Sequence, residues 1–410
     1  MQKSILKKYA ELLVGTGVNL QKGETLVVSS PIGAADLAEE IALCAYRKKA
    51  ANVEMLWSDE KIARMGYRYR TKRSLSEVPE WVIAQRKHFI EKKIAYLVIL
   101  SDDPENLKGI DPEKTAAARR ARAKALAEFR EYTSSNKIRW CIGSYPNKAW
   151  AKKMFPDLSA REAVKKQWEY IAKTMRLDAE DPVAAWEEHQ KNLERRSAVL
   201  NGAKIRSFTY RNSLGTDFTV AMPKGYIFCG GAEKSVPDGI PFTANMPTEE
   251  VFSCPDYRTA NGKLVASKPL CRNGQMIRDF WFEFKDGKIV GYGAKEGYEN
   301  LKSIVETDEG SRSLGEIALV GYHSPIQTLG AMFYETLFDE NASCHFAIGD
   351  CYPCCIEGGG DMTEEQLKEK GLNHSLEHVD FMVGTEDLSI VAEKENGEKL
   401  VVFENGDWAI

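Results

Sequence analysis

The stretch Glu24-Thr-Leu-Val-Val-Ser-Ser30, with residues 34–49 after it, decides the fold of the first half of this chain. The first segment is a short β-branched run, which predicts a buried strand, and the second has apolar residues at helical spacing. Three more strand candidates follow at Val53-Glu-Met-Leu-Trp57, Ala95-Tyr-Leu-Val-Ile-Leu100 and Ile138-Arg-Trp-Cys-Ile142. Strands that alternate with helices are typical of a parallel or mostly parallel α/β sheet.

A different pattern begins after two further predicted helices, at residues 159–176 and 183–200. From Ser207 onward, short strands alternate with Gly and Asn turns, as in Phe280-Trp-Phe-Glu-Phe284. At 410 residues the chain is also long for a single core. We therefore predict an N-terminal α/β domain over residues 1–204 and a β-rich α+β domain over residues 205–410.

Composition excludes several classes of function. Hydrophobic residues make up 43% and charged residues 28% of the chain, as in ordinary globular enzymes, and a net charge of -4 gives no case for nucleic-acid binding. The nine cysteines are scattered without framework spacing, which favours reduced thiols in a cytoplasmic protein. The N-terminal segment has no apolar run typical of a signal peptide, and no apolar run is long enough for a membrane span.

The second half contains an unusual combination of histidines and acids. Four of the six histidines follow residue 320, among acidic residues in apolar or small-residue segments. His378 and Asp380 lie two apart in a predicted strand, so their side chains share one face. Buried Asp and His need partners, and a divalent cation satisfies several such groups at once.

Upstream residues could complete this metal site. Glu316 is a single acid in the apolar run Leu314–Val320, where burial without a partner is costly, whereas Glu250 could also lie on a solvated strand face. Glu340 stands close before His345, while His323 and His374 adjoin Ser or Asn in predicted loops and are weaker candidates. The candidate ligands are Glu250, Glu316, Glu340, His345, His378 and Asp380. Six ligands, mostly oxygen donors, suit two metals that share a carboxylate, and zinc, cobalt and manganese all fit.

Three other motifs each have a simpler structural explanation. Gly15-Thr-Gly17 precedes a strand and lacks a third glycine, which argues against a dinucleotide site. Residues 358–360 are three glycines that could form a flexible turn or a close backbone approach. Cys351-Tyr-Pro-Cys-Cys355 has no second cysteine pair at structural-zinc spacing, which argues against a zinc finger. The phenol of Tyr352 could donate to a developing oxyanion, although a lone tyrosine is more often a packed aromatic.

At these residues the chain resembles the thermophilic-type metalloaminopeptidases, the family of aminopeptidases T and S. The resemblance extends from the N-terminal run Tyr9–Gly23 over essentially the whole chain, and it is most specific in four later segments. These are Asn245-Met-Pro-Thr-Glu-Glu-Val-Phe252, Leu314-Gly-Glu-Ile-Ala-Leu319, Asp339-Glu-Asn-Ala-Ser-Cys-His-Phe-Ala-Ile-Gly349 and His378-Val-Asp-Phe-Met-Val-Gly384.

The resemblance implies a homodimeric exopeptidase that removes N-terminal residues from peptides with a free N-terminus. It implies the six metal ligands named above in the C-terminal domain, two divalent ions that activate a water, and a role in the chemistry for Glu316 and Tyr352. Two alternatives stay open: a non-catalytic module in which metal only holds the second domain together, and a metal-dependent hydrolase of another amide, such as a deacylase.

Overall fold

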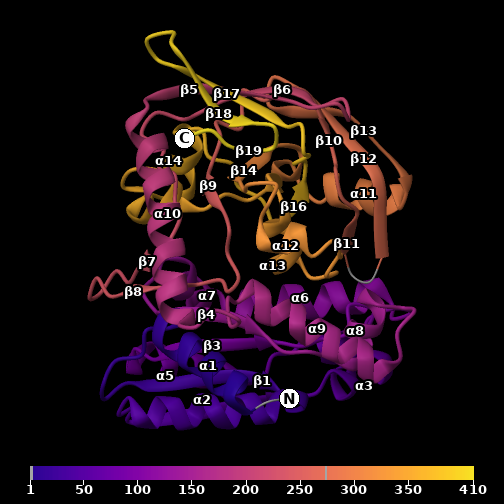
Figure 1. Cartoon of the computed structure of the whole chain (residues 1–410). Coiled ribbons are helices and arrows are strands. Elements are labelled where there is room, and N and C mark those ends of the chain that lie inside the picture. Colours follow the sequence, from indigo (N-terminus) through magenta and orange to yellow (C-terminus); the bar gives the residue numbers. More distant parts are fainter. Residues whose placement is uncertain (1–2, 273–274) are drawn as a thin grey trace. The chain divides into compact units, whose positions relative to one another are not determined.

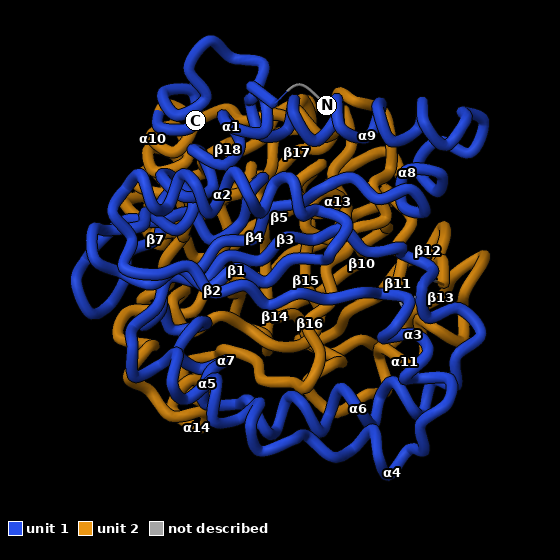
Figure 2. The backbone as a smooth tube through the Cα atoms, turned by 90° about the horizontal axis from the view of Figure 1, so that it is seen from below, with its two compact units in different colours: residues 1–187, 232–247 blue, residues 188–231, 248–410 orange. Residues whose placement is uncertain are grey.

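The computed structural model describes residues 3–272 and 275–410, and the chain forms two compact units (Figures 1 and 2). Unit 1 comprises Met1–Glu187 and Ala232–Pro247, and unit 2 comprises Glu188–Gly231 and Thr248–Ile410. The boundary predicted between residues 204 and 205 falls between the long helix α10 (Pro182–Gly202) and strand β5 (Ile205–Arg211). As a division into domains it stays a prediction.

Unit 1 is built on a four-stranded sheet of order β2-β1-β3-β4, in which every pairing is parallel. The strands are β1 (Thr25–Pro31), β2 (Asn52–Ser58), β3 (Ala95–Leu100) and β4 (Trp140–Ser144). Leu26, Val27 and Val28 of β1 are fully buried, as the β-branched run predicted. The N-terminal α/β class is therefore confirmed.

Helices precede, connect and follow these strands. They are α1 (Lys3–Leu12), α2 (Ala35–Arg47), α3 (Glu60–Tyr69), α4 (Lys72–Leu75), α5 (Glu80–Lys92), α6 (Pro112–Ala125), α7 (Ala127–Ser134), α8 (Lys148–Met154) and α9 (Ala160–Thr174), with a π-helical turn η1 (Leu13–Gly17) and a 3₁₀ turn η2 (Ile32–Ala34). Asp111 caps α6, because its Oδ1 accepts a hydrogen bond from the Glu113 amide at 2.9 Å. A short ribbon of β7 (Glu233–Lys234) and β8 (Pro241–Phe242) returns to unit 1.

Packing accounts for Gly17, the second glycine of the short motif that resembled a nucleotide-binding loop. Gly17 ends η1, and a Cβ at this position would lie 2.8 Å from the Cys141 sulfur. The glycine therefore allows η1 to approach β4 closely. Near the other end of the chain, a Cβ on Gly359 would lie 2.1 Å from the Pro353 carbonyl oxygen, so a close backbone approach is made within residues 358–360 by Gly359.

Unit 2 is rich in antiparallel sheet. Its larger sheet has the order β11-β12-β10-β6-β5-β17-β18-β19, with β13 also paired to β12. Besides β5, the strands are β6 (Asp217–Ala221), β10 (Asn261–Val265), β11 (Leu270–Arg272), β12 (Gln275–Lys285), β13 (Lys288–Glu296), β17 (Ser389–Lys394), β18 (Lys399–Glu404) and β19 (Asp407–Trp408). The helical segments are α11 (Tyr298–Val305), α12 (Pro325–Thr328), α13 (Thr336–Asp339), α14 (Glu364–Glu369), η3 (Gly310–Arg312), η4 (Glu340–Ala342), η5 (Pro353–Cys355) and η6 (Gly359–Asp361).

A smaller antiparallel sheet of order β16-β15-β14-β9 completes unit 2. Its strands are β9 (Val251–Ser253), β14 (Leu314–Leu319), β15 (His345–Gly349) and β16 (His378–Met382). One face of this sheet supplies Ile317, Phe346 and Phe381 to the main hydrophobic core. The rings of Phe346 and Tyr210 lie 4.9 Å apart, and so do those of Phe381 and Phe282, so this core joins the two sheets.

The residues that the structure describes include no helix with the length and apolar character needed to cross a bilayer.

Candidate metal centre

The second face of the small sheet carries most of the predicted ligands. Side chains alternate along a strand, so the residues next to Ile317, Phe346 and Phe381 in their strands point away from the core. This alternation places Glu316, His345, His378 and Asp380 on one face. Glu250 lies immediately before β9 and two residues from Phe252, which pairs with Ala318 on the same face.

Strand register brings these side chains together around a small residue. Glu316 of β14 is opposite Ala347 of β15, and Ala347 is opposite Asp380 of β16. A methyl group thus separates two carboxylates in one row of the sheet. Ala347 is buried, and its small size leaves the space between Glu316 and Asp380 open to their own side chains and those of the histidines.

The ligand atoms form two groups that share Glu316. His345 Nε2 lies 3.2 Å from Glu250 Oε2 and 3.5 Å from Glu316 Oε1. His378 Nε2 lies 3.6 Å from the other Glu316 oxygen, Oε2, and 3.2 Å from Asp380 Oδ1. Within each group, Glu250–Glu316–His345 and Glu316–His378–Asp380, the donor atoms all lie within 4.8 Å of one another.

Backbone carbonyls fix both imidazoles. His378 Nδ1 lies 2.8 Å from the Asp350 carbonyl oxygen, and His345 Nδ1 lies 3.3 Å from that of Ser343. A carbonyl can only accept, so Nδ1 carries the proton in each ring. Each Nε2 then faces the carboxylates, and a neutral ring would offer its lone pair there, as in many metal-binding histidines.

The electrostatics of the cluster indicate a need for positive charge. Burial raises the pKa of Glu316 to about 7 and that of Glu340 well above its usual range, and neighbouring carboxylates add to both effects. Burial opposes the charged form of His378, but Asp380 and Glu316 outweigh it and raise its pKa to about 10. In the absence of cations, protons are therefore held at these groups. A divalent cation would supply the same charge to the same oxygen and nitrogen donors, so the residues fit one.

Glu340 and Tyr352 lie at the edge of this arrangement. Glu340 begins η4 and lines a small cavity with Asp380, but it belongs to neither group of three ligand atoms. The Tyr352 ring lies 5.1 Å from the His378 ring and 5.9 Å from Phe252, and 40% of the residue is exposed. Burial of its hydroxyl end and the charges of Glu316 and Asp380 raise its pKa well above the usual range, so the phenol stays a hydrogen-bond donor.

The two weaker histidine candidates have other partners. His323 Nδ1 pairs with Asp407, and His374 pairs with Asp350 at 2.9 Å and Glu364 at 3.2 Å. Ala347 was missed from the sequence, although it follows His345 by two residues in a strand. The strand alternation alone could have marked it as part of the site.

Comparison with known proteins identifies the family of this chain. The family model described as thermophilic metalloprotease (M29) matches residues 2–408. The chain belongs to this family. It is 41% identical to aminopeptidase 2 of Geobacillus stearothermophilus, over 98% of this chain and 97% of that protein. It is 40% identical to aminopeptidase AmpS of Bacillus subtilis (strain 168), over 98% of each chain.

A solved structure extends the likeness to the fold. Wild-type AmpT from Thermus thermophilus superposes with a TM-score of 0.93 and 33% identity, over 100% of both chains. The predicted order, an α/β region followed by a β-rich region, is thus confirmed. So is the predicted class: the chain is a metal-dependent aminopeptidase of the thermophilic metalloprotease family. Membership of a metalloprotease family also implies a divalent metal, for which the His and Glu cluster is the candidate site.

Proposed function

We propose that this enzyme hydrolyses the N-terminal peptide bond of peptides with a free N-terminus, and that two divalent ions in the cluster activate the water. The position of Glu316 supports two ions, because its two carboxylate oxygens face different histidines. A carboxylate in this position suits a bridge between two cations.

The proposed ligands follow the two groups of donor atoms. Glu250, Glu316 and His345 would hold one ion, and Glu316, His378 and Asp380 would hold the other. Glu340 would join them from η4, since it lies close enough for the charges of Asp380 and Glu250 to act on it. The donors are nitrogen and oxygen only, so zinc, cobalt and manganese all remain suitable.

The chain's own residues would divide the chemistry. When bound, the cations would polarise the scissile carbonyl and lower the pKa of the attacking water. The Glu316 carboxylate lies at the centre of the cluster, and it would accept the proton of that water through an oxygen that is not bound to a cation at that step. The Tyr352 phenol would donate a hydrogen bond to the oxyanion as it develops.

The free α-amine explains why cleavage would be limited to the N-terminal residue. An amine can bind a metal or pair with an acidic side chain, and the cluster supplies several carboxylates. An N-acetyl group removes the basic nitrogen without much change in the rest of the substrate. The pair of substrates therefore tests the proposal directly.

The experiment compares free-amine and N-acetylated aminoacyl substrates, before chelation, after chelation and after metal return. We expect hydrolysis of the free-amine substrate alone, with loss on chelation and recovery with zinc, cobalt or manganese. Faster hydrolysis of the acetylated substrate would instead indicate a deacylase. Absence of hydrolysis with every metal would favour the non-catalytic metal-binding module.

A further inference from the structure

A second cluster of metal-binding side chains lies in unit 2, apart from the histidines and carboxylates. Five of the nine cysteines gather there: Cys229, Cys254, Cys351, Cys354 and Cys355. The described cysteines form no disulfide. The sequence argued against a zinc finger at residues 351–355 because no second cysteine pair is near, but the fold brings Cys229 and Cys254 to this segment.

Backbone pairing builds the cluster from three segments. The Cys229 amide donates to the Phe252 carbonyl at 2.8 Å, and the Phe252 amide donates back at 2.9 Å. Cys254 follows Phe252 by two residues, so it continues the same segment. The Ile227 amide donates to the Cys355 carbonyl at 2.7 Å, which brings the third segment alongside Cys229.

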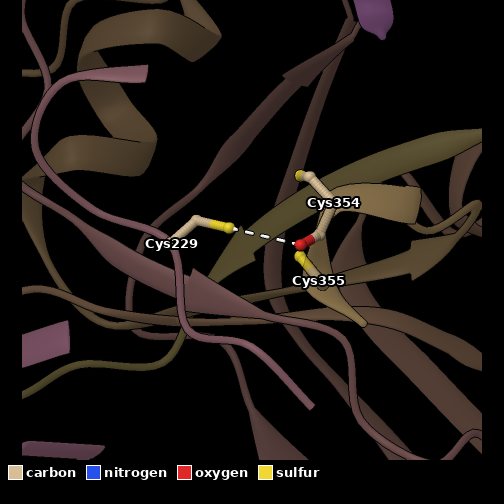
Figure 3. Close-up of side chains that lie close together, drawn as sticks. All are labelled: Cys229, Cys354 and Cys355. Carbon is tan, nitrogen blue, oxygen red and sulfur yellow. Dashed lines mark hydrogen bonds between the residues drawn. The ribbon is translucent and has the colours of Figure 1, made fainter. Parts of the chain in front are cut away.

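The sulfur atoms converge at the meeting point of these segments. The Sγ atoms of Cys229, Cys354 and Cys355 all lie within 4.8 Å of one another, and Figure 3 shows the three side chains together. The Cys229 thiol also lies 3.7 Å from the Cys354 carbonyl oxygen. In a tetrahedral zinc site, zinc–sulfur bonds of about 2.3 Å place the sulfurs about 3.8 Å apart. Small side-chain rotations would bring the three sulfurs to that spacing.

Cys254 offers a fourth sulfur, which contacts Cys355 but lies outside the group of three whose sulfurs are mutually within 4.8 Å. It is fully buried, as is Cys355, and the thiols of Cys351 and Cys355 hydrogen-bond its sulfur. The Tyr352 amide also donates to this sulfur, at 3.3 Å. A sulfur held in this way has the character of a thiolate ligand.

We propose that Cys229, Cys254, Cys354 and Cys355 form a separate thiolate site for one zinc-type cation. Thiolates are soft ligands, and four of them around one ion are typical of a structural zinc site. The His and carboxylate cluster contains no sulfur, so the two sites differ in chemistry. This inference does not depend on the proposed mechanism of peptide hydrolysis.

The site would hold the segment that carries Tyr352. Two of the proposed ligands, Cys354 and Cys355, lie in η5, which Tyr352 precedes directly. The third ligand is Cys254, whose sulfur lies 3.5 Å from the Tyr352 carbonyl oxygen. The same sulfur accepts a hydrogen bond from the Tyr352 amide. A bound ion would therefore join the η5 segment to the strand region around residues 229 and 254.

Cobalt(II) is the probe for this proposal, because a cobalt–thiolate bond gives an intense near-ultraviolet charge-transfer absorption that nitrogen and oxygen ligands do not give. The full chain, reduced and stripped of metal, is titrated with cobalt without oxygen. We expect the sulfur band to reach the intensity of one thiolate-bound cobalt per chain. It should saturate within three equivalents, since the His and carboxylate cluster would take up two further ions, and it should disappear when zinc is added. Peptide hydrolysis is not measured, so this result stands apart from the proposed function.

Variants identify the ligands. Cys229→Ser and Cys354→Ser change partly exposed positions, so both should fold, as circular dichroism checks. Each should lose most of the sulfur band, whereas Cys271→Ser, a partly exposed cysteine of β11, should keep it. The proposal is overturned if bound cobalt gives no sulfur band, if both cluster variants retain it, or if the reduced protein takes up no metal and oxidises to a Cys229–Cys354 disulfide.

Discussion

Glu316 belongs to both groups of candidate ligand atoms, so its charge serves two tasks at once. Glu316→Gln keeps the shape of the side chain but removes the negative charge that binds a cation or accepts a proton. We expect turnover to fall about a thousandfold or more, measured with a free-amine aminoacyl substrate at saturating metal. Glu283→Gln on β12, outside the cluster, is the control and should stay near wild type. Activity of Glu316→Gln within about tenfold of wild type would remove Glu316 from the mechanism.

Substitution of Tyr352 tests the contribution of a single hydrogen bond. Its ring contacts His378 and Phe252, and these contacts survive in Tyr352→Phe. If the phenol donates to the oxyanion, the variant loses an interaction made mainly in the transition state. The turnover number should then fall about a hundredfold, with KM, metal content and Tm little changed.

The matched control for Tyr352→Phe is Tyr298→Phe in α11, where 44% of the tyrosine is exposed. It should keep full turnover. Normal turnover in Tyr352→Phe would return the residue to packing alone. Loss of metal in that variant would show that Tyr352 supports the ligands and is not a catalytic residue.

At the scale of the elements, β14, β15 and β16 form the site because their polar and apolar faces alternate. Ala347 keeps the row between Glu316 and Asp380 open. Ala347→Val adds two methyl groups there, and we expect metal content and turnover to fall at least tenfold. Metal analysis and peptide hydrolysis measure the two effects.

Overpacking alone lowers the free energy of unfolding by about 1–3 kcal/mol, so the control must enlarge a comparably buried alanine elsewhere. Ala392→Val in β17 enlarges another fully buried alanine, opposite Phe208 in the larger sheet. It should lose comparable stability but retain metal. If both variants retain metal equally, the size of residue 347 does not control the site.

In unit 1, the Tyr9 side chain joins α1 to β4 through hydrogen bonds. Its buried hydroxyl donates to the Ser144 carbonyl at 3.0 Å and accepts from the Ser144 amide at 2.9 Å. Tyr9→Phe leaves both backbone groups buried without this partner, which should lower the free energy of unfolding by about 1–3 kcal/mol. Urea unfolding measures the change, and the exposed Tyr46→Phe should show none. An unchanged midpoint in Tyr9→Phe would mean that water replaces the hydroxyl.

Local pattern explains what the sequence could predict about the elements and the site. The β-branched run at β1 and the spacing of His378 and Asp380 depend only on neighbours in the chain. Both could therefore be recognised in the sequence. Strand order was not, because the pairing of Glu316 with Ala347 and of Ala347 with Asp380 joins segments far apart in sequence. The family resemblance supplied these remote partners as a set, where spacing alone could not.

At the scale of the whole chain, long-range pairing also concealed the cysteine cluster. Cys229 and Cys354 are separated by 125 positions, and Phe252 holds Cys229 in place through the backbone. No local spacing rule reports such a contact. The return of Ala232–Pro247 to unit 1 is hidden for the same reason, since it depends on a two-stranded ribbon within a stretch of short segments.

Removal of metal tests the whole molecule, because the two units depend on metal to different extents. The parallel sheet of unit 1 is built from backbone pairing and apolar packing, and the candidate ligands all lie in unit 2. The large apolar core of unit 2 likewise lies on the opposite face of the small sheet from the ligands. A chelator should therefore abolish peptide hydrolysis while the far-UV circular dichroism stays largely intact, and zinc, cobalt or manganese should restore turnover. A non-catalytic metal module would behave differently, because its metal binding is coupled to folding. Global loss of structure on chelation, with no hydrolysis under any metal, would thus reject the catalytic interpretation and support the structural one.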